Sequence, residues 1–539
     1  MDWYRDAIIY EVRVRSYSDG NGDGIGDFRG LIGKLDYIRD LGVTAIWILP
    51  FYPSPLTDDG YDIADYLGVH PDCGTLEDFE EFLAEAHRRD LQVITELVLN
   101  HTSDRHPWFQ RARGAPPGSP ERDWYVWSDT PERYQDVRII FQDFEPSNWT
   151  WDEQAGAYFW HRFYRTQPDL NFASPDVRRA MLEVVDFWLG MGVDGLRLDA
   201  VPYLFEREGT TCDNLPETHA FLRELRAHID ARHPGRMLLA EANLWPEEAA
   251  AYFGEKGDEC HMAFNFPIMP RLYLALATGD RTPVSWILGR MPPLPPGAQW
   301  ATFLRNHDEL TLEMVTPAER ALMHEVYAAD RRAIVNLGIR RRLAPLCGGD
   351  RRKIELLTTL LLALPGTPVL YYGDEIGMGD DLSLPDRYGV RTPMQWSAEP
   401  FAGVSATEPA LPVVAEPPFS YVDVNVAAQD PYPDSLLNWT RRALATRADM
   451  AELFGRGGMT LVDTENAHVL AFLRDYAFRT VLVVANFACT PQAADLALTR
   501  YSGRVPADLG SGERWPALTA DPYRVTLGPY GVYWLELTR

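Results

Sequence analysis

The feature that most constrains the fold is a repeated alternation of short apolar, β-branched segments with amphipathic helical stretches. Eight strand-like segments occur in this alternation, at residues 8–14, 44–50, 92–100, 195–200, 237–241, 261–266, 300–308 and 367–375. Such an alternation is typical of a parallel sheet whose strands are connected by helices. Eight βα units predict an α/β fold, a (β/α)8 TIM barrel, which carries its chemistry at the carboxyl ends of its strands.

Two stretches depart from this alternation. Residues 102–172 are far longer than a βα loop requires and are rich in Pro, Gly and aromatic residues, which predicts an inserted subdomain after the third strand. From about residue 456 the pattern changes to alternating strands and turns, which predicts a C-terminal antiparallel β-sandwich domain. We therefore expect a catalytic barrel at 1–101 and 173–455, the subdomain at 102–172 and the β domain at 456–539.

The composition disfavours several classes of partner. A net charge of −27 and a pI near 4.8 argue against nucleic acid and membrane surfaces, because phosphate groups would be repelled. A small neutral substrate is compatible with this charge. The five cysteines are scattered without CxxC spacing, and the first residues include acids where a signal peptide has bases, so a cytoplasmic location is expected. The sequence leaves a homo-oligomer open.

Acidic residues end three of the predicted strands. Asp199, Glu241 and Asp308 each follow an apolar run, so each is expected at the barrel mouth, where an unused charge is costly. Arg197 lies two residues before Asp199 on the same strand and points to the same side, where it would favour the ionised carboxylate. A single such acid is often a helix cap, but three on different strands indicate an active site.

The same segments carry a family resemblance. The four segments ELVLNH, GLRLDA, LLAEA and FLRNHD are similar to the signature regions of the α-amylase family of glycoside hydrolases. QPDLN (167–171) and RTPMQW (391–396) resemble the α-glucosidase-type branch of that family. Longer blocks, such as residues 200–219 and 257–267, resemble the members that isomerise maltose to trehalose.

The resemblance implies a retaining transfer of an α-glucosyl group that isomerises maltose to trehalose within one active site. Asp199 would form the glucosyl-enzyme, Glu241 would act as acid and then as base, and Asp308 would hold the sugar hydroxyls. Two alternatives within the same chemistry are an α-glucosidase that hydrolyses maltose-type α-glucosides and a glucosyltransferase to another acceptor. An inactive sugar-binding protein is a third, and the three acids argue against it.

The resemblance also implies which residues bind the sugar. Asp62, beside Tyr61 after the second strand, would hold the terminal glucose together with Arg391. The structural alternative for Asp62 and Arg391 is an ordinary ion pair. The full expected set of sugar-binding residues is Tyr61, Asp62, His101, Phe163, Arg197, His307 and Arg391.

Three residues depart from the pattern of these relatives. Glu96 stands where the third-strand signature commonly begins with Asp, and we interpret it as a conservative structural change. Leu244 and Asn265 stand where the maltose isomerases usually have Gln and His, at or near the expected sugar-binding rim. The choice of acceptor therefore stays open.

The loop SDGNGDGIGD, residues 18–27, raises the question of a metal. Its acidic spacing resembles the start of an EF-hand, but Gly30 occupies position 12 and a strand-like segment precedes the loop, which disfavours a helix–loop–helix switch. The spacing alone leaves either a calcium loop or a metal-free Gly/Asp turn. The resemblance favours a structural calcium held by the side chains of Asp19, Asn21, Asp23 and Asp27 and the Ile25 carbonyl.

A second structural calcium is implied beneath the inserted subdomain. Its expected ligands are Asn100, Asp169 and Glu206 and the carbonyls of Tyr203 and Leu204. No organic cofactor is expected.

Overall fold

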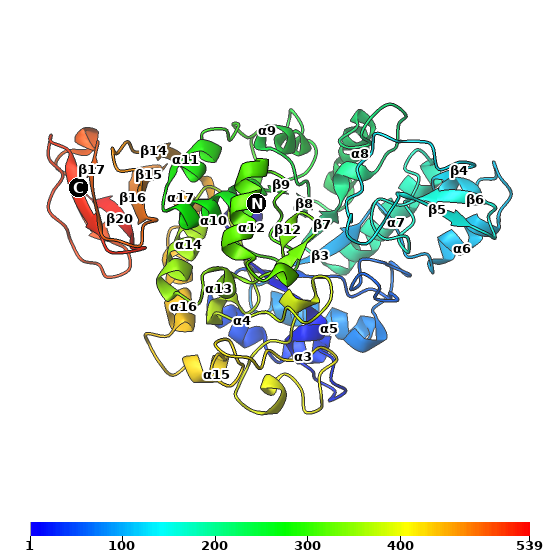
Figure 1. Cartoon of the computed structure of the whole chain (residues 1–539), viewed down its shortest axis with the longest axis horizontal. Helices are drawn as coiled ribbons and strands as arrows, with labels where there is room; N and C mark the ends of the chain where they lie inside the picture. Colours follow the sequence, from blue (N-terminus) through cyan, green and yellow to red (C-terminus); the bar gives the residue numbers. More distant parts are fainter. Residues whose placement is uncertain (1, 539) are drawn as a thin grey trace.

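Eight parallel strands close into a barrel in the computed structural model, which describes residues 2–538 (Figure 1). Around the barrel the order is β1-β13-β10-β9-β8-β7-β3-β2, and β1 closes on β13 with Ile9 opposite Val369. The (β/α)8 prediction is confirmed, with one strand in each predicted segment. The strands are β1 (Ile9–Val12), β2 (Ala45–Ile48), β3 (Gln92–Val98), β7 (Gly195–Asp199), β8 (Met237–Ala240), β9 (Met262–Phe264), β10 (Gln299–Phe303) and β13 (Thr367–Tyr371).

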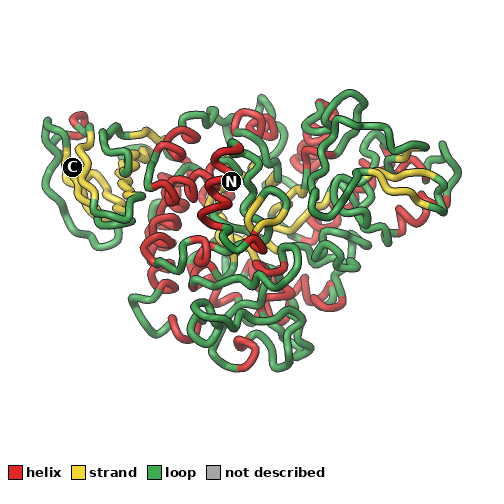
Figure 2. Tube along the Cα trace, in the orientation of Figure 1, coloured by secondary structure: helices red, strands yellow, loops and turns green. Residues whose placement is uncertain are grey.

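Helices cover the outside of the barrel (Figures 1 and 2). In α7 the buried residues Val177, Met181 and Val184 recur at spacings of three and four, so a single stripe of the helix faces the strands. The longer helices are α5 (Leu76–His87), α7 (Pro175–Met191), α8 (Pro216–Arg232), α10 (Ile268–Thr278), α12 (Pro317–Tyr327), α14 (Arg351–Ala363) and α16 (Leu436–Ala448). No helix among residues 2–538 is long and apolar enough to cross a membrane.

The segment between β3 and β7 forms a small three-stranded antiparallel sheet, on the right in Figure 1. Its strands are β4 (Trp127–Ser128), β5 (Trp149–Asp152) and β6 (Ala157–Trp160), and α6 (Pro107–Gly114) precedes them. Trp149, Trp160 and Tyr134 pack in a separate core of this segment. Several of its aromatic residues are therefore structural, whereas Phe141 and Phe163 line the pocket described below.

The C-terminal region is an antiparallel β domain, as predicted, at the opposite end of the molecule in Figure 1. A five-stranded sheet, β14-β15-β16-β20-β18, and the two-stranded sheet β17-β19 share one hydrophobic core, which makes a sandwich. The strands are β14 (Gly458–Leu461), β15 (Val469–Tyr476), β16 (Arg479–Asn486), β17 (Gln492–Leu496), β18 (Val505–Asp508), β19 (Tyr523–Leu527) and β20 (Val532–Thr538).

A buried arginine of β15 joins this domain to the barrel. Arg474 donates from Nη1 to the carbonyl of Ala363, the last residue of α14, at 2.6 Å. Its Nη2 donates to the carbonyls of Phe454 and Gly457 at 2.7 and 2.9 Å, at the end of α17 (Ala451–Arg456). One guanidinium thus satisfies carbonyls at two helix ends that have no partner within their own helices.

Candidate active site

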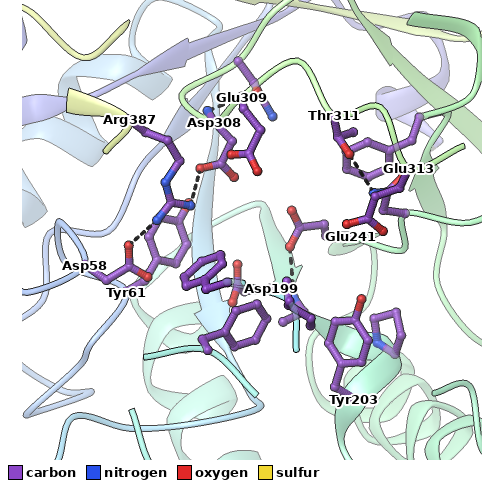
Figure 3. A pocket seen from close by; sticks show the side chains of 18 of the residues that line it. Asp58, Tyr61, Asp199, Tyr203, Glu241, Asp308, Glu309, Thr311, Glu313 and Arg387 are labelled. Atoms are coloured by element: carbon purple, nitrogen blue, oxygen red, sulfur yellow. Dashed lines mark hydrogen bonds and ion pairs between the residues drawn. The ribbon is translucent and has the colours of Figure 1, made fainter. Parts of the chain in front are cut away.

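The three acidic strand ends meet in one pocket at the barrel mouth (Figure 3). Asp199 is the last residue of β7, Glu241 directly follows β8, and Asp308 lies five residues after the end of β10. The pocket contains about 840 Å³ of space, including the part open to solvent. A concave pocket lined by several polar side chains is the usual form of a small-molecule binding site.

Arg197 binds the two central carboxyl groups with one guanidinium. Its Nη1 donates to Asp199 at 2.5 Å and to Glu96 at 2.9 Å, and its Nη2 lies 2.7 Å from Oε1 of Glu241. The Arg197 side chain is only 1% exposed. Because one planar cation bridges Asp199 and Glu241, the two carboxyl groups are held close together, as the short separation of a retaining pair requires.

Burial and the Arg197 charge act in opposite directions on these two carboxyl groups. Burial raises the pKa of Asp199 to about 6, and Arg197 limits that rise. Burial also raises the pKa of Glu241 to about 8, with Arg197 lowering it and the Asp199 charge raising it. At pH 7 Asp199 is therefore mostly ionised and Glu241 mostly protonated, the states of a nucleophile and a general acid.

Asp308 is held by two arginines. Its Oδ1 accepts hydrogen bonds from Arg387 at 2.9 Å and from Arg391 at 3.0 Å. Burial alone would raise the pKa of Asp308, but His307 and the two arginines lower it below the usual value. Nε2 of His307 lies 2.8 Å from the Tyr61 hydroxyl, and the two rings stack. Asp308 is therefore an ionised acceptor in the pocket.

The predicted sugar-binding role of Asp62 does not fit its position. Asp62 is fully buried, and its carboxylate accepts hydrogen bonds from the Ser54 hydroxyl and from the backbone N–H groups of Thr57 and Asp58. These bonds close the loop after β2, so the carboxylate has a structural task. The predicted pairing of Asp62 with Arg391 is wrong.

The Asp–Arg pair that lines the pocket lies four residues earlier at both positions. Asp58 accepts a hydrogen bond from Arg387 Nη2 at 2.6 Å, and both side chains line the pocket (Figure 3). Arg391 is not among the lining residues and pairs with Asp59 at 3.1 Å. The Arg387 guanidinium also sits over the Phe141 ring at 4.9 Å, so the inserted subdomain touches the pair.

The other predicted sugar-binding residues divide into lining and supporting groups. Tyr61, His101 and Phe163 line the pocket. Arg197 and His307 are outside the lining and bind residues that belong to it. Glu96 accepts hydrogen bonds from Trp47, Tyr61 and Arg197.

Several lining residues were missed by the sequence reasoning. Glu309, Thr311 and Glu313 directly follow Asp308, and this proximity to a strand-end acid was the available signal. The remaining ones were not assigned to the pocket, and Tyr203 was expected only as a calcium ligand; they are Asp58, Ile140, Phe141, Ala200, Pro202, Tyr203, Asn243, Phe266, Asn306 and Arg387. Leu244 and Asn265, the two departures expected near the rim, are outside the lining.

The predicted second calcium site has three oxygen atoms without a partner. Oδ1 of Asn100, Oδ2 of Asp169 and Oε1 of Glu206 are buried and accept no hydrogen bond within the described part of the chain. Buried acceptors without a donor are costly, and oxygen atoms are the ligands that calcium takes. These residues therefore fit the ion.

The predicted first calcium loop is satisfied by its own hydrogen bonds. Asp19 accepts from the backbone N–H groups of Gly22 at 2.6 Å and Gly24 at 2.8 Å, and Asp27 accepts from Gly30 at the start of α3 (Phe28–Ile32). No group of three or more His, Cys, Asp or Glu side chains positioned for a metal occurs within residues 2–538. Calcium in this loop stays a prediction.

Comparison with known proteins places this geometry in a family. Residues 11–455 match the family model described as the α-amylase catalytic domain, and residues 459–534 match that of the maltogenic amylase C-terminal domain. The chain belongs to the α-amylase family. As a member of that family it is an enzyme.

Similar members of the α-amylase family include two trehalose synthases. The protein of Thermus thermophilus is 57% identical over 98% of this chain, which spans about half (55%) of that relative's length. The protein of Pimelobacter sp. is 52% identical over 100% of this chain and 96% of its own. A probable α-glucosidase of Rhizobium meliloti is 32% identical over 93% of this chain and 92% of its own.

Solved structures of sugar-transferring enzymes share the fold. A trehalulose synthase of Pseudomonas mesoacidophila superposes with a TM-score of 0.79 at 28% identity, and 99% of both chains is covered. An α-glucosyl transfer enzyme superposes with a TM-score of 0.80 at 30% identity, also over 99% of both chains.

Proposed function

We propose that the enzyme isomerises maltose to trehalose by a retaining, intramolecular transfer of an α-glucosyl group. The observation that carries this proposal is the bridging of Asp199 and Glu241 by Arg197 inside the pocket at the barrel mouth. The trehalose synthases at 52 to 57% identity support the choice of reaction. The alternative of a hydrolytic α-glucosidase uses the same residues with water as the acceptor.

In the first step the Asp199 carboxylate attacks the anomeric carbon of the non-reducing glucose. The glycosidic C–O bond breaks, and Glu241 gives its proton to the leaving oxygen, which frees the second glucose. Asp58 and Arg387 hold the hydroxyls of the glucose that becomes covalently bound. Asp308 contributes to the rate if it binds the distorted ring of the transition state more tightly than the ground state.

In the second step the freed glucose turns and attacks the glucosyl-enzyme with its anomeric hydroxyl. The Glu241 carboxylate accepts the proton of that hydroxyl, the new bond joins the two anomeric carbons, and Asp199 leaves as a carboxylate. Water has to be kept out during the turn. Arg138 of the inserted subdomain lies 2.9 Å from Glu313 on the pocket wall, a bridge that suits a closed pocket.

Product analysis distinguishes the isomerase from the hydrolase. The enzyme is incubated with maltose, and trehalose and glucose are followed by NMR. Trehalose without net glucose supports the proposal, whereas glucose alone refutes it in favour of the hydrolase. Asp199→Ala should abolish both products, and substantial remaining turnover would refute the nucleophile assignment.

We also propose that calcium stabilises the fold through the two predicted sites. The three unpartnered oxygens of Asn100, Asp169 and Glu206 support the second of them. When bound, calcium would supply positive charge for these buried carboxylates, and no catalytic step requires it. A reducing cytoplasm is our proposal for the compartment, and the free state of all five cysteines suits it.

A further inference from the structure

A network of buried polar side chains extends from the first barrel strand to the guanidinium that holds the nucleophile and the acid. It begins at Glu11 in β1, which is fully buried and outside the pocket lining. Nδ1 of His307 lies 2.5 Å from Oε1 of Glu11, and Nε2 of the same ring lies 2.8 Å from the Tyr61 hydroxyl. That hydroxyl lies 3.1 Å from Oε1 of Glu96, which Arg197 binds. We call these five side chains the Glu11 network.

The contacts between Glu11 and Glu96 require three protons. Three contacts join the two carboxyl groups, the imidazole and the phenol, and each needs one hydrogen between its two atoms. A neutral imidazole has one N–H and a phenol has one O–H, which supply two of the three. Burial lowers the pKa of His307 well below its usual value, so the ring is neutral. The third proton therefore belongs to one of the two carboxyl groups.

Glu11 is the carboxyl group that holds this proton. Its Oε2 is buried and has no hydrogen-bond donor among residues 2–538, which makes an ionised Glu11 costly. Burial raises its pKa well above the usual value. Glu96 accepts hydrogen bonds from Arg197 and from the Trp47 indole, both at 2.9 Å, and these donors favour its ionised form. Burial raises the pKa of Glu96 to about 7, and Arg197 limits that rise.

The Glu11 proton fixes the direction of the hydrogen bonds that follow. The Glu11 O–H donates to Nδ1 of His307, so the imidazole proton is on Nε2 and points to the Tyr61 oxygen. The Tyr61 O–H then donates to Glu96. With the opposite tautomer of His307, Tyr61 would donate to the ring and Glu96 would lose a donor. Tyr61 stacks on His307 and lines the pocket, so the network reaches the pocket wall (Figure 3).

We infer that Glu11 is a positioning residue for the first step of the reaction, because its proton selects the Nε2–H tautomer of His307 and thereby fixes Tyr61 at the pocket wall. The inference rests on the proposed function, since it needs the transfer of a glucosyl group to Asp199. Glu11 itself lies outside the pocket lining and acts only through its neighbours.

The test compares two substitutions at position 11. Glu11→Gln keeps a donor for Nδ1 of His307, because an amide N–H can replace the carboxyl O–H, whereas Glu11→Met removes the donor and has a similar length. The value of kcat/KM for release of 4-nitrophenol from 4-nitrophenyl α-glucoside reports the first step, whatever the acceptor is. We expect this value to fall at least about tenfold in Glu11→Met and to stay within about threefold of wild type in Glu11→Gln.

Glu375→Met is the matched control. Glu375 is a buried carboxyl group after β13 that accepts hydrogen bonds from the hydroxyls of Tyr10 and Tyr37 at 2.7 and 2.8 Å, and it is outside the pocket lining. Its loss should lower the melting temperature, as in Glu11→Met, and leave kcat/KM within about twofold of wild type. Circular dichroism at the assay temperature verifies that each variant is folded. If Glu11→Met does not fold, Glu11→Gln decides alone.

A value of kcat/KM within about threefold of wild type in Glu11→Met overturns the inference, because the tautomer would then be fixed without Glu11. So does a tenfold fall in Glu11→Gln, because a neutral donor at this position would then be insufficient. If the wild-type enzyme converts maltose to glucose alone, the proposed function fails, while kcat/KM of the two variants still decides the role of Glu11.

Discussion

Replacing Arg197 by Met removes the cation that holds the nucleophile and the acid together. The side chains of Arg197 and Glu96 are fully buried, and those of Asp199 and Glu241 are 11% and 19% exposed. Without it the three carboxyl groups lose their opposite charge, and their pKa values rise further. Met has a similar length and no charge, so the substitution changes mainly the electrostatics.

The pKa values of Asp199 and Glu241, about 6 and about 8, predict a bell-shaped profile of kcat/KM in the wild type. Asp199 has to be ionised and Glu241 protonated, so activity falls below about pH 6 and above about pH 8. Loss of a neighbouring opposite charge raises a carboxyl pKa by roughly 1 to 3 units. For a rise of about 2 units, the ionised fraction of Asp199 at pH 6 falls roughly 50-fold.

Stability should change in the same direction. Breaking a buried ion pair from one side costs about 3 to 5 kcal/mol, because the remaining charges are uncompensated. Carboxyl groups with a raised pKa in the folded state take up protons on folding, so their destabilising effect grows as the pH rises. The melting temperature of Arg197→Met should therefore fall below wild type more at pH 8 than at pH 5.

The assay is a pH profile of kcat/KM with 4-nitrophenyl α-glucoside, together with thermal melts. The exposed Arg332→Met, whose guanidinium binds Asp330 at the surface, is the control for loss of one positive charge. An acidic limb that stays at the wild-type pH in Arg197→Met would show that Arg197 does not set the ionisation of Asp199, and the electrostatic reasoning would be wrong.

Two further predictions concern the sugar clamp and the metal. Asp58→Asn should lower kcat/KM at least about tenfold, because a charge-assisted bond to Arg387 and the sugar is lost. Asp62→Asn should lower the melting temperature and leave kcat/KM much closer to wild type, because its carboxylate bonds only within its own loop. Equal effects of both variants on kcat/KM would contradict this assignment. Removal of calcium with a chelator should lower the melting temperature, since an ion at 100 times its Kd stabilises the folded state by about 2.7 kcal/mol. In Glu206→Gln the chelator should lower the melting temperature by less. An unchanged melting temperature of the wild type would count against both calcium sites.

The sequence was sufficient to predict the barrel and its three acids. Asp199, Glu241 and Asp308 follow apolar strand segments, and parallel strands bring their carboxyl ends to one face. Strand alternation also placed Arg197 on the same side as Asp199, where the structure shows the contact. Both predictions rest on the regular geometry of strands: alternation fixes the side to which a residue points, and parallel strands of a barrel end at one face.

The sugar clamp could not be assigned in the same way, because a loop has no fixed period. The segment from Asp58 to Asp62 holds three aspartates within five residues. Asp59 and Gly60 adopt left-handed backbone conformations, with φ of 52° and 107°. This turn sends the Asp58 carboxylate to the pocket and the Asp62 carboxylate back into its own loop. Such a difference follows from tertiary contacts that the residue pattern does not contain.

The contacts of Arg474 bear on how experiments with shortened chains are interpreted. A chain ended before β15 would lose the guanidinium that satisfies the carbonyls at the ends of α14 and α17. In such a chain the carbonyl oxygens at these helix ends would have no hydrogen-bond donor from the β domain. An inactive truncation would therefore report a weakened scaffold, and a chemical role for the β-sandwich could be tested only by substitutions on its surface.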